Sequence, residues 1–498
     1  MGGAVAHAPE IGGRTRSGFA EAWVPGTLEV QKLLRLCFAI ILAKLIARLC
    51  RALGRAGSTL PGRVALRIAP GLIETLAQQA RRGTVVVTGT NGKTTTATML
   101  ATILRSAGYR VVHNREGANL LRGLASTLCR AAGVNGRLHA DVVVMEVDEA
   151  TVPQAIVRLR PMAVVVTNFF RDQLDRYGEL ERTVGLVAEG IARLNARSCA
   201  VLCADDPLVA ELSRWVPCRL IFFGVETRPW VPREMPHAAD AKYCRQCDAP
   251  YRYEFLVYGH LGSYLCPRCG HRRPRPDVRL ARFEPVGASG CHLEMRANGR
   301  SVAVRLKVPG AYNAYNALAA CAAALSMGIH EEHIIRGLES FRGAFGRMEA
   351  VRVGGRRVLL ALVKNPAGFN EVISALVRGA DSGTIGLVVA INDRQADGTD
   401  VSWLWDVDFE RLTQVAHRIQ LLVTSGTRAH DMAVRLKYAG MDPARIQPIP
   451  GLGQAIRAAL DAVEPDSLLY LLCSYTAMLQ ARRALERMKA VGRIWEDQ

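Results

Sequence analysis

This sequence of 498 residues lacks a long apolar run and is poor in aromatic side chains, which make up 6% of the chain. A membrane-spanning helix needs roughly 18–20 consecutive apolar residues. The best candidate, the run from Leu36 to Ala43, ends at Lys44. The sequence also has no block of basic residues interleaved with aromatics, a pattern typical of nucleic-acid binding. A spanning segment is therefore not predicted, and nucleic acid is not the expected partner.

Acidic residues are in short supply. The 64 lysines and arginines exceed the 45 aspartates and glutamates by 19. Such an excess of positive charge favours anionic partners, including phosphorylated substrates and membrane surfaces as well as nucleic acid. With 49% hydrophobic residues, the chain is long enough for two or three domains, each with its own core.

No secretory signal precedes the 13 cysteines, and their number is odd, which favours a reducing compartment over a disulfide framework. Only four are regularly spaced: Cys244 and Cys247 form one CxxC pair, and Cys266 and Cys269 form a second. The two pairs flank a short tyrosine-rich segment and predict a four-cysteine zinc ribbon within residues 236–278. Four thiolates fill the tetrahedral shell of Zn²⁺, so we expect a structural site; redox activity of the pairs is the alternative.

Residues 85–96, VVVTGTNGKTTT, run from an apolar strand through a glycine-rich turn into a helical stretch. The glycines let the backbone of the turn point its N–H groups at anionic oxygens, while the lysine adds a positive charge and the next hydroxyl can bind Mg²⁺. A glycine-rich turn with a chance lysine is the alternative, but strand, turn and helix follow in the order that an ATP-binding loop requires. The predicted nucleotide contacts here are Gly89, Thr90, Asn91, Gly92, Lys93 and Thr94.

Strand-like apolar segments recur after this turn, and helix-length segments separate most of them. This alternation predicts an α/β fold with a parallel sheet covered on both faces. A second α/β unit begins near residue 350, with strand-like segments at 356–366, 384–393, 418–426 and 467–475. The expected organisation is a flexible leader at 1–30, a basic amphipathic helix at 31–56, a central ATP-binding domain at 57–330 with the ribbon inserted at 236–278, and a Rossmann-like C-terminal domain at 335–498.

The N-terminal helix has a helical period from Leu42 onward. Leu42, Ile46, Leu49 and Leu53 fall on one predicted face, and Lys44, Arg48, Arg51 and Arg55 fall on the other. A basic amphipathic helix of this kind can lie on an anionic membrane. Packing on the domain body, with the basic face in water, is the alternative.

Polar residues gather at the ends of the predicted strands, where open α/β sheets bind their ligands. Glu146 and Asp148 end one strand, and a carboxylate there beside Thr94 predicts a Mg²⁺ site, with capping of the next helix as the alternative. An ordinary turn explains Asp206-Pro207 as well as ligand binding does. The other candidates in this sheet are Asn168, Arg171, Asp172, Asp175, Asp205 and Asp206.

In the last domain, segment 391–410 (INDRQADGTDVSWLWDVDFE) combines many acids with two tryptophans, which favours a site over a solvated loop. Position alone does not choose among its acids. Lys364 and the backbone amides of KNPAGFN, at another strand end, can meet an anion. The acidic candidates are Asp393, Asp397, Asp400, Asp406 and Asp408.

The motifs GTNGKTTT, VMEVDE, TNFFRDQLDRYGE, ADDP, AYNAYNALAA, GRME and KNP occur in the order found in the Mur ligase family, which the chain resembles over roughly residues 33–490. Mur ligases use ATP to join an amine to a peptidoglycan-precursor carboxylate through an acyl phosphate. The four-cysteine ribbon and the segment 391–410 narrow the resemblance to the MurT branch. Its members are the ligase-like subunits of lipid II isoglutaminyl synthase, whose partner GatD is a glutamine amidotransferase.

The resemblance implies an ATP-, Mg²⁺- and Zn²⁺-containing enzyme of the cytoplasm, with contact to the inner face of the membrane as a further expectation. It would amidate the α-carboxylate of D-glutamate in the lipid II stem peptide to D-isoglutamine, using ammonia released by a GatD-like partner. Glu146 is then a magnesium ligand, and Asp400 completes the partner's Cys–His pair or acts at the joined active site. The further nucleotide contacts that the resemblance implies are Thr95, Asn316, which holds the base, and Arg347.

The chain departs from Mur ligases that add amino acids. Gln173, Tyr312 and Lys364 stand where those enzymes usually carry histidine, and Cys203 replaces the usual asparagine. These changes fit a branch that uses ammonia. The chain has no obvious Cys–His glutaminase unit, so a glutamine-dependent reaction needs a second protein. The alternatives are a ligase that adds an amino acid to a carboxylate, as folylpolyglutamate synthetases do, and a non-catalytic zinc scaffold.

Overall fold

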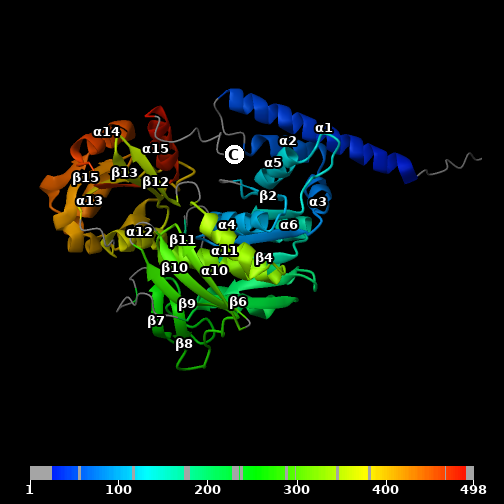
Figure 1. Ribbon diagram of the computed structural model, residues 1–498, viewed down its shortest axis with the longest axis horizontal. Coiled ribbons are helices and arrows are strands. Elements are labelled where there is room, and N and C mark those ends of the chain that lie inside the picture. Colours follow the sequence, from blue (N-terminus) through cyan, green and yellow to red (C-terminus); the bar gives the residue numbers. More distant parts are fainter. Residues whose placement is uncertain are drawn as a thin grey trace, which may run out of the picture.

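Two α/β units lie side by side in the computed structural model, one blue to green and the other yellow to red in Figure 1. Residues 1–24 of the predicted leader lie outside the described part. The described residues are 25–53, 58–114, 118–172, 180–226, 235, 239–286, 290–297, 299–343, 347–378, 383–465 and 467–488.

The first unit is built on a sheet of nine strands in the order β11-β10-β9-β6-β5-β4-β1-β3-β2. Neighbouring strands from β2 to β9 are parallel, whereas β9, β10 and β11 pair antiparallel. Every residue of β1, β3, β4 and β5 is buried, as valine-rich strands covered on both faces require. The predicted α/β fold with a parallel sheet is confirmed. The strands are β1 (Thr84–Thr88), β2 (Val111–His113), β3 (Val142–Glu146), β4 (Ala163–Val166), β5 (Cys199–Cys203), β6 (Arg219–Val225), β9 (Val278–Pro285), β10 (Cys291–Ala297) and β11 (Arg300–Leu306).

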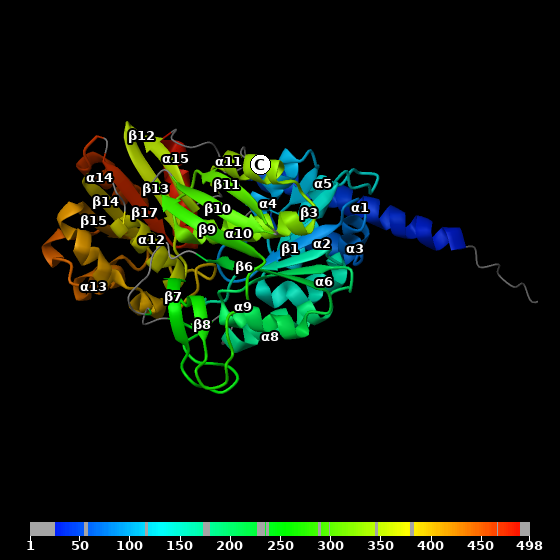
Figure 2. The same cartoon turned by 60° about the horizontal axis from the view of Figure 1, so that its bottom comes forward.

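Helices cover this sheet on both sides. The helices α4, α10 and α11 pack together, and α6 and α8 lie across the sheet from them (Figure 2). The helices are α1 (Pro25–Ala52), α2 (Leu60–Ile68), α3 (Leu72–Ala77), α4 (Lys93–Ser106), α5 (Leu121–Ala131), α6 (Val152–Leu159), α8 (Leu180–Ala192), α9 (Pro207–Glu211), α10 (Ala311–Ser326) and α11 (Glu331–Ser340), with 3-10 turns η1 (Glu149–Thr151) and η2 (Leu212–Trp215).

The N-terminal helix packs on the protein through a different side from the apolar face that the sequence predicts. It packs on α2 and α5, and its buried side chains include Leu36, Ala39 and Ile40. Leu49 and Leu53 of the predicted apolar face are 61% and 66% exposed, so this face does not pack on the domain body, as one of the two alternatives expected. The helix has two apolar sides, and the period of residues 42–53 could not tell which side meets the body. Within the described ranges, no helix is long and apolar enough to cross a bilayer.

A two-stranded hairpin, β7 (Arg252–Tyr258) and β8 (Leu261–Leu265), is inserted between β6 and β9. The two flanking strands are nevertheless neighbours in the large sheet, where Phe223 pairs with Val278. The insert therefore leaves the sheet continuous, and its hairpin lies at the bottom of Figure 2.

The second unit has a sheet of six strands in the order β12-β13-β17-β14-β15-β16. Only β12 pairs antiparallel with its neighbour. The four predicted strands correspond to β13, β14, β15 and β17; the two edge strands, β12 and β16, were missed. The elements are β12 (Arg347–Val353), β13 (Arg356–Leu362), α12 (Pro366–Arg378), β14 (Ile385–Ala390), η4 (Ser402–Asp406), η5 (Phe409–Arg418), β15 (Ile419–Ser425), α13 (Ala429–Tyr438), η6 (Pro443–Arg445), β16 (Ile446–Pro448), α14 (Leu452–Ala462), β17 (Leu468–Cys473) and α15 (Tyr475–Arg487).

Candidate active site

The turn between β1 and α4 is shaped by two glycines with positive φ, Gly89 at 116° and Gly92 at 85°. A Cβ atom at Gly89 would lie 2.3 Å from Oγ1 of Thr167, and one at Gly92 would lie 2.1 Å from Oδ1 of Asn316. Both backbone conformation and space therefore exclude a side chain at these positions. Because α4 begins at Lys93, its unpaired N–H groups and positive dipole end face the turn, an arrangement suited to phosphate.

The segment that follows β4 holds this turn in place. The backbone N–H groups of Thr90 and Asn91 donate to the carbonyl oxygen and to Oδ1 of Asn168, at 2.8 and 2.9 Å. Nδ2 of Asn168 donates back to the carbonyl of Asn91 at 3.1 Å. Asn168, a candidate ligand contact from the sequence, thus fixes the shape of the turn.

The Lys93 ammonium group is buried among acceptors of its own protein. It donates to the carbonyls of Gly89 and Thr90 and forms an ion pair with Glu149, at 3.1 Å between Nζ and Oε2. Burial lowers the pKa of Lys93, but Glu149 and the neighbouring carboxylates outweigh that effect and leave the pKa above its ordinary value. The lysine is therefore cationic throughout the neutral range. Glu149 was not a candidate from the sequence.

Thr94 and Glu146 meet as the sequence predicts. Oγ1 of Thr94 donates to Oε2 of Glu146 at 2.7 Å. Asn114 orients this strand end, because its Nδ2 donates to the Glu146 carbonyl and its Oδ1 accepts the Glu146 N–H, both at 2.7 Å. Asp148 instead caps the turn η1, accepting the Ala150 N–H at 3.3 Å. The capping alternative thus applies to Asp148, and Glu146 remains the candidate for Mg²⁺.

A cavity opens beside the turn, between the two units. Asn316 borders it and accepts a hydrogen bond from Oγ1 of Thr96 at 3.3 Å, while its Nδ2 donates to Asn313 at 3.3 Å. The structure therefore brings Asn316 and Thr95 to the same cavity as the phosphate turn. The lining residues are Asn91, Gly92, Thr95, Tyr258, Tyr312, Asn316, Ala361, Leu362, Ala367, Gly368, Glu371 and Val372.

Tyr258 is a lining residue that sequence reasoning missed. It is the last residue of β7, in the inserted hairpin, and is only 4% exposed. Its ring stacks on Phe170 at 5.8 Å between centroids and meets the edge of Tyr315 at 5.4 Å. Its hydroxyl accepts a bond of 3.4 Å from Nδ2 of Asn168. A tyrosine in a ribbon insert carries no signal for a nucleotide pocket, because only the fold brings it there.

The KNP motif of the second unit reaches the turn of the first. Nδ2 of Asn365 donates to Oδ1 of Asn91 at 3.0 Å. The Lys364 ammonium group forms an ion pair with Asp172, which follows the segment that clamps the turn. The two units therefore meet at the turn between β1 and α4, and Lys364 is already paired with protein.

Asp205 and Asp206 have structural roles. Asp205 accepts hydrogen bonds from the Tyr315 hydroxyl and from Nε of Arg273, both at 2.6 Å. Its burial raises its pKa, an effect that Arg273 opposes. Asp206 caps α9 through the Leu208 N–H at 2.8 Å. Both carboxylates are fully buried, so the turn interpretation is correct for Asp206.

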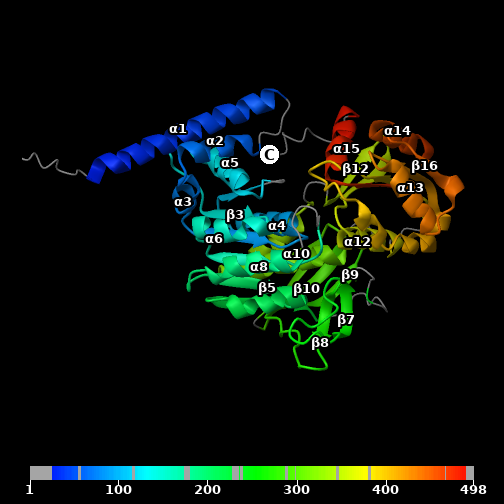
Figure 3. The same ribbon diagram turned by 180° about the vertical axis from the view of Figure 1, so that it is seen from behind.

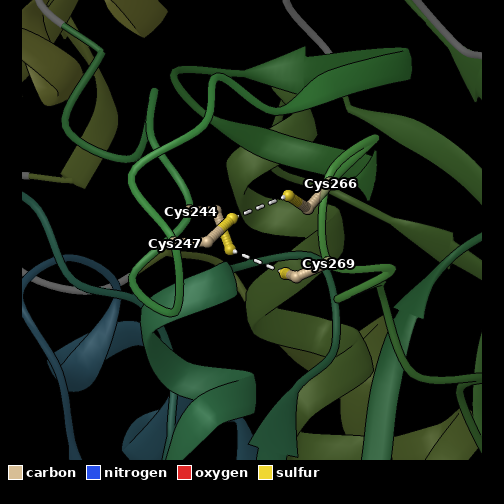
Figure 4. Close-up of side chains that lie close together, drawn as sticks. All are labelled: Cys244, Cys247, Cys266 and Cys269. Atoms are coloured by element: carbon tan, nitrogen blue, oxygen red, sulfur yellow. Dashed lines mark hydrogen bonds between the residues drawn. The ribbon is translucent and has the colours of Figure 1, made fainter.

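The four spaced cysteines converge. Cys244 and Cys247 come from one loop and face Cys266 and Cys269 from a second (Figure 4). The sulfur atoms lie within 4.8 Å of one another, with two pairs at 3.5 Å. Four thiolates about 2.3 Å from one Zn²⁺ would be ~3.8 Å apart, so this cluster fits a tetrahedral metal ion.

Matching turns shape the two loops of the cluster. Asp248 and Gly270 directly follow the second cysteine of each pair, and both have positive φ. Their N–H groups donate to the carbonyls of Cys244 and Cys266, at 2.8 and 3.1 Å. Since the same turn recurs at both pairs, the backbone holds the four cysteines in an arrangement that could bind a metal ion.

Other positions named from the sequence are paired within the protein or lie outside the described residues. Arg171 forms an ion pair with Asp240. Gln173 and Asp175 lie outside the described residues, and of Arg347 only the backbone, at the start of β12, is described.

Two family models match the chain: the Mur ligase middle domain over residues 87–247 and the MurT ligase C-terminal domain over residues 362–478. A lipid II isoglutaminyl synthase (glutamine-hydrolyzing) subunit MurT from Staphylococcus aureus (strain COL) is 32% identical over 404 residues, 81% of this chain and 88% of that relative. The subunit of the same name from Streptococcus pneumoniae (strain ATCC BAA-255 / R6) is 32% identical over 439 residues, 88% of this chain and 94% of that protein. The chain belongs to the MurT family.

Solved structures agree on the fold. A pseudomurein peptide ligase type C from Methanothermus fervidus superposes with a TM-score of 0.61 at 22% identity, covering 82% of this chain and 79% of that one. MurF from Acinetobacter baumannii gives a TM-score of 0.62 at 19% identity, covering 86% and 79%. The Mur ligase fold predicted for this MurT-family chain is confirmed.

The acidic segment that follows β14 in this MurT-family chain contains several structural carboxylates. Asp397 is buried and accepts the Thr476 N–H at 2.7 Å. Asp393 accepts from the Thr427 hydroxyl at 2.8 Å and from Arg428 at 2.9 Å. These hydrogen bonds hold the acidic segment to α15 and to the residues that follow β15.

Asp408 and Asp400 differ in what they contact. Asp408 accepts a hydrogen bond from Asn370 of α12 at 3.2 Å. Asp400 is exposed, and its Oδ1 accepts the Ser402 N–H at 2.8 Å within the same loop. Asp406 is also exposed, on η4. Exposure favours Asp400 and Asp406 for contact with a partner, and the position of Asp400 in this exposed loop fits the role that the MurT resemblance gives it.

Proposed function

We propose that this chain is the ATP-dependent ligase subunit of a lipid II isoglutaminyl synthase. It would convert the α-carboxylate of D-glutamate in the lipid II stem peptide to the amide of D-isoglutamine. The relatives are named as subunits of a lipid II isoglutaminyl synthase, and the observation that supports this function in the chain is the Lys93, Thr94 and Glu146 arrangement around a glycine-shaped turn. ATP, lipid II and ammonia are the proposed substrates.

The chemistry has two steps. A carboxylate oxygen of D-glutamate attacks the γ-phosphorus of ATP; an acyl phosphate forms, and ADP leaves with the electrons of the broken P–O bond. Ammonia then attacks the carbonyl carbon, phosphate departs, and loss of a proton leaves the amide. In the first step negative charge moves among phosphate oxygens, so positioning and electrostatic stabilisation are what the protein must supply.

The residues of the turn are suited to that task. Lys93 lies at its base with a permanent positive charge, which we propose transfers from Glu149 to the phosphates of ATP. Oγ1 of Thr94 and Oε2 of Glu146 are 2.7 Å apart, and neighbouring oxygens in a Mg²⁺ shell are ~3 Å apart. These two atoms therefore fit a magnesium ion, which would neutralise phosphate charge when bound. Asn316, Thr95 and Arg347 are the proposed contacts to the rest of the nucleotide.

Ammonia is proposed to come from a GatD-like glutamine amidotransferase that binds the C-terminal unit. Asp400 is the proposed contribution of this chain to the partner's active site, because an exposed carboxylate can orient a histidine and stabilise its charged form. We also propose that the cysteine cluster holds Zn²⁺ in a structural role, that the chain divides near residue 335, and that it works at the cytoplasmic face of the membrane.

The test uses the purified chain without a partner. It is incubated with lipid II, Mg-ATP and ammonium chloride, and both ADP and the mass of the stem peptide are followed. Slow, ATP-dependent conversion of one carboxylate to an amide is the expected result. Turnover that requires a free amino acid in place of ammonia would favour an amino-acid ligase and overturn the proposal.

A further inference from the structure

The helix α1 has apolar side chains on two opposite sides. One side, including Leu36, Ala39 and Ile40, is buried against the body of the protein. The other side faces away from the protein. Its residues follow one another at intervals of three or four, which places them on a single face of a helix. They are Val30, Leu34, Phe38, Ile41, Leu45 and Leu49, with exposed fractions of 56%, 63%, 58%, 40%, 53% and 61%.

We call these six residues the outer stripe. It runs over about 20 residues, ~30 Å of helix. Single exposed leucines are ordinary on protein surfaces, but a continuous row of large apolar side chains marks a surface that binds something apolar. Figures 1 and 3 show α1 along the outside of the molecule, with its N-terminal end projecting beyond the body.

Cations border the outer stripe. At 100° per residue, Arg35 falls on one flank, and Arg48 and Arg51 fall on the other. All three are exposed. The helix has five lysines and arginines and a single acid, Glu29. Long basic side chains beside an apolar face are typical of helices that lie in the headgroup region of an anionic bilayer, since the charges reach the lipid phosphates while the apolar side chains enter the acyl region.

We propose that α1 is an interfacial membrane helix, which seats the protein on an anionic lipid surface through the outer stripe. A second copy of the chain is a poorer occupant, because symmetric pairing of two such helices would bring their cationic flanks together. This contact of α1 with lipid goes beyond the proposed function, because it names the surface of the protein that meets the membrane.

The experiment measures flotation of the full chain with vesicles of phosphatidylcholine, alone or mixed with phosphatidylglycerol. The test variant is Leu34→Glu/Phe38→Glu/Leu45→Glu. Its matched control, Val157→Glu/Val434→Glu/Tyr438→Glu, adds the same charge at apolar residues that are 52%, 47% and 71% exposed elsewhere. We expect binding to mixed vesicles that the test variant weakens at least about tenfold and the control leaves nearly unchanged.

A second variant, Arg35→Gln/Arg48→Gln/Arg51→Gln, tests whether the arginines beside the outer stripe contribute to binding of anionic lipid. It should lose most of the preference for phosphatidylglycerol, and the same loss should follow when salt is raised in the wild type. Sedimentation velocity tests whether the outer stripe pairs with a second copy of the chain. A deletion of residues 1–24 tests whether the stripe binds the leader. The proposal is overturned if wild-type protein ignores mixed vesicles, if the test variant binds them as well as the wild type, or if the stripe is needed for a dimer or for the leader and not for lipid.

Failure of this inference and failure of the proposed function can be told apart. Amidation of lipid II dissolved in detergent micelles should be unchanged in the test variant, whereas amidation of lipid II in vesicles should fall with binding. Vesicle binding without any amidation would leave the membrane helix standing and refute the reaction.

Discussion

The Lys93 ammonium group and the Glu149 carboxylate form an ion pair of 3.1 Å, with side chains that are only 9% and 10% exposed. The lysine expected to bind phosphate is thus paired inside the protein. Burial raises the pKa of Glu149, and Lys93 opposes this effect. Each of the two residues therefore stabilises the charged form of the other. Phosphates that enter the turn would bring a competing negative charge.

Changing Glu149 to Gln should therefore destabilise the protein without nucleotide by about 3 kcal/mol, because a buried cation loses its nearest counter-charge. Mg-ADP should then stabilise the variant more than it stabilises the wild type. Urea unfolding with and without Mg-ADP measures both effects, and Glu332→Gln, at a side chain 86% exposed, is the control. Equal stabilisation of variant and wild type by Mg-ADP would contradict the exchange of partners.

Thr94 and Glu146 should act together on magnesium. Thr94→Val removes one oxygen and should lower turnover at least about 100-fold, while Thr94→Ser should retain most activity. Glu146→Gln should raise the Mg²⁺ concentration needed for half-maximal ATP turnover. Titration of Mg²⁺ at fixed ATP measures this requirement. An unchanged requirement in Glu146→Gln would remove this residue from the metal site.

Tyr258 connects the cysteine cluster to the cavity beside the turn, where we propose that the nucleotide binds. One end of β7 adjoins Tyr251, which packs with Cys244 and Cys266, and the other end is Tyr258. Tyr258→Ala should raise KM for ATP several-fold with a smaller change in kcat, and Tyr258→Phe should behave almost as the wild type, because its hydroxyl bond is long at 3.4 Å. If both variants lose kcat alike, the hydroxyl has a chemical role instead.

Loss of one metal ligand should act on folding before it acts on chemistry. Cys244→Ser should release zinc and lower the unfolding temperature, because metal binding is coupled to folding in such sites. Metal content by mass spectrometry and thermal unfolding test this, with Cys321→Ser as a control outside the cluster. A folded variant that binds ATP normally but is inactive would show a direct role for the ribbon.

Asp400→Asn should abolish amidation driven by glutamine and leave much of the reaction driven by ammonia. The physical reason is that its carboxylate is proposed to act on the partner's histidine and not on the acyl phosphate. The two rates are compared in the reconstituted complex, with Asp461→Asn, at an exposed aspartate on α14, as the control. Equal loss of both reactions in Asp400→Asn would place its role in the ligase site.

Asp393 should make the stability of the folded protein depend on pH. The Thr427 hydroxyl and Arg428 lower the pKa of Asp393 below its ordinary value. A lowered pKa in the folded state stabilises the protein above the unfolded value, ~3.9, and this contribution is lost as the pH falls through the folded value. Asp393→Asn should therefore be less stable at pH 7, by less than about 1 kcal/mol because the pair is partly exposed. Denaturant unfolding from pH 7 to 3 should show this difference shrinking below pH 4.

The sequence by itself determined the features that depend on near neighbours along the chain. The run of valines, the two glycines and the Lys93-Thr94 pair specify strand, turn and helix within a dozen residues, and the spacing within each CxxC pair sets its loop. Local patterns of this kind are readable because backbone conformation and short-range geometry decide them.

Only the tertiary structure decided which polar side chains form hydrogen bonds within the protein and which remain exposed. Asp205 and Asp400 both follow predicted strands, yet Asp205 is bonded to Tyr315, 110 residues away, while Asp400 is exposed. Tyr258 at the cavity and the outward face of α1 were likewise settled by distant contacts. Burial and pairing depend on what the fold brings together, so a pattern along the chain can nominate a side chain but cannot say what it touches.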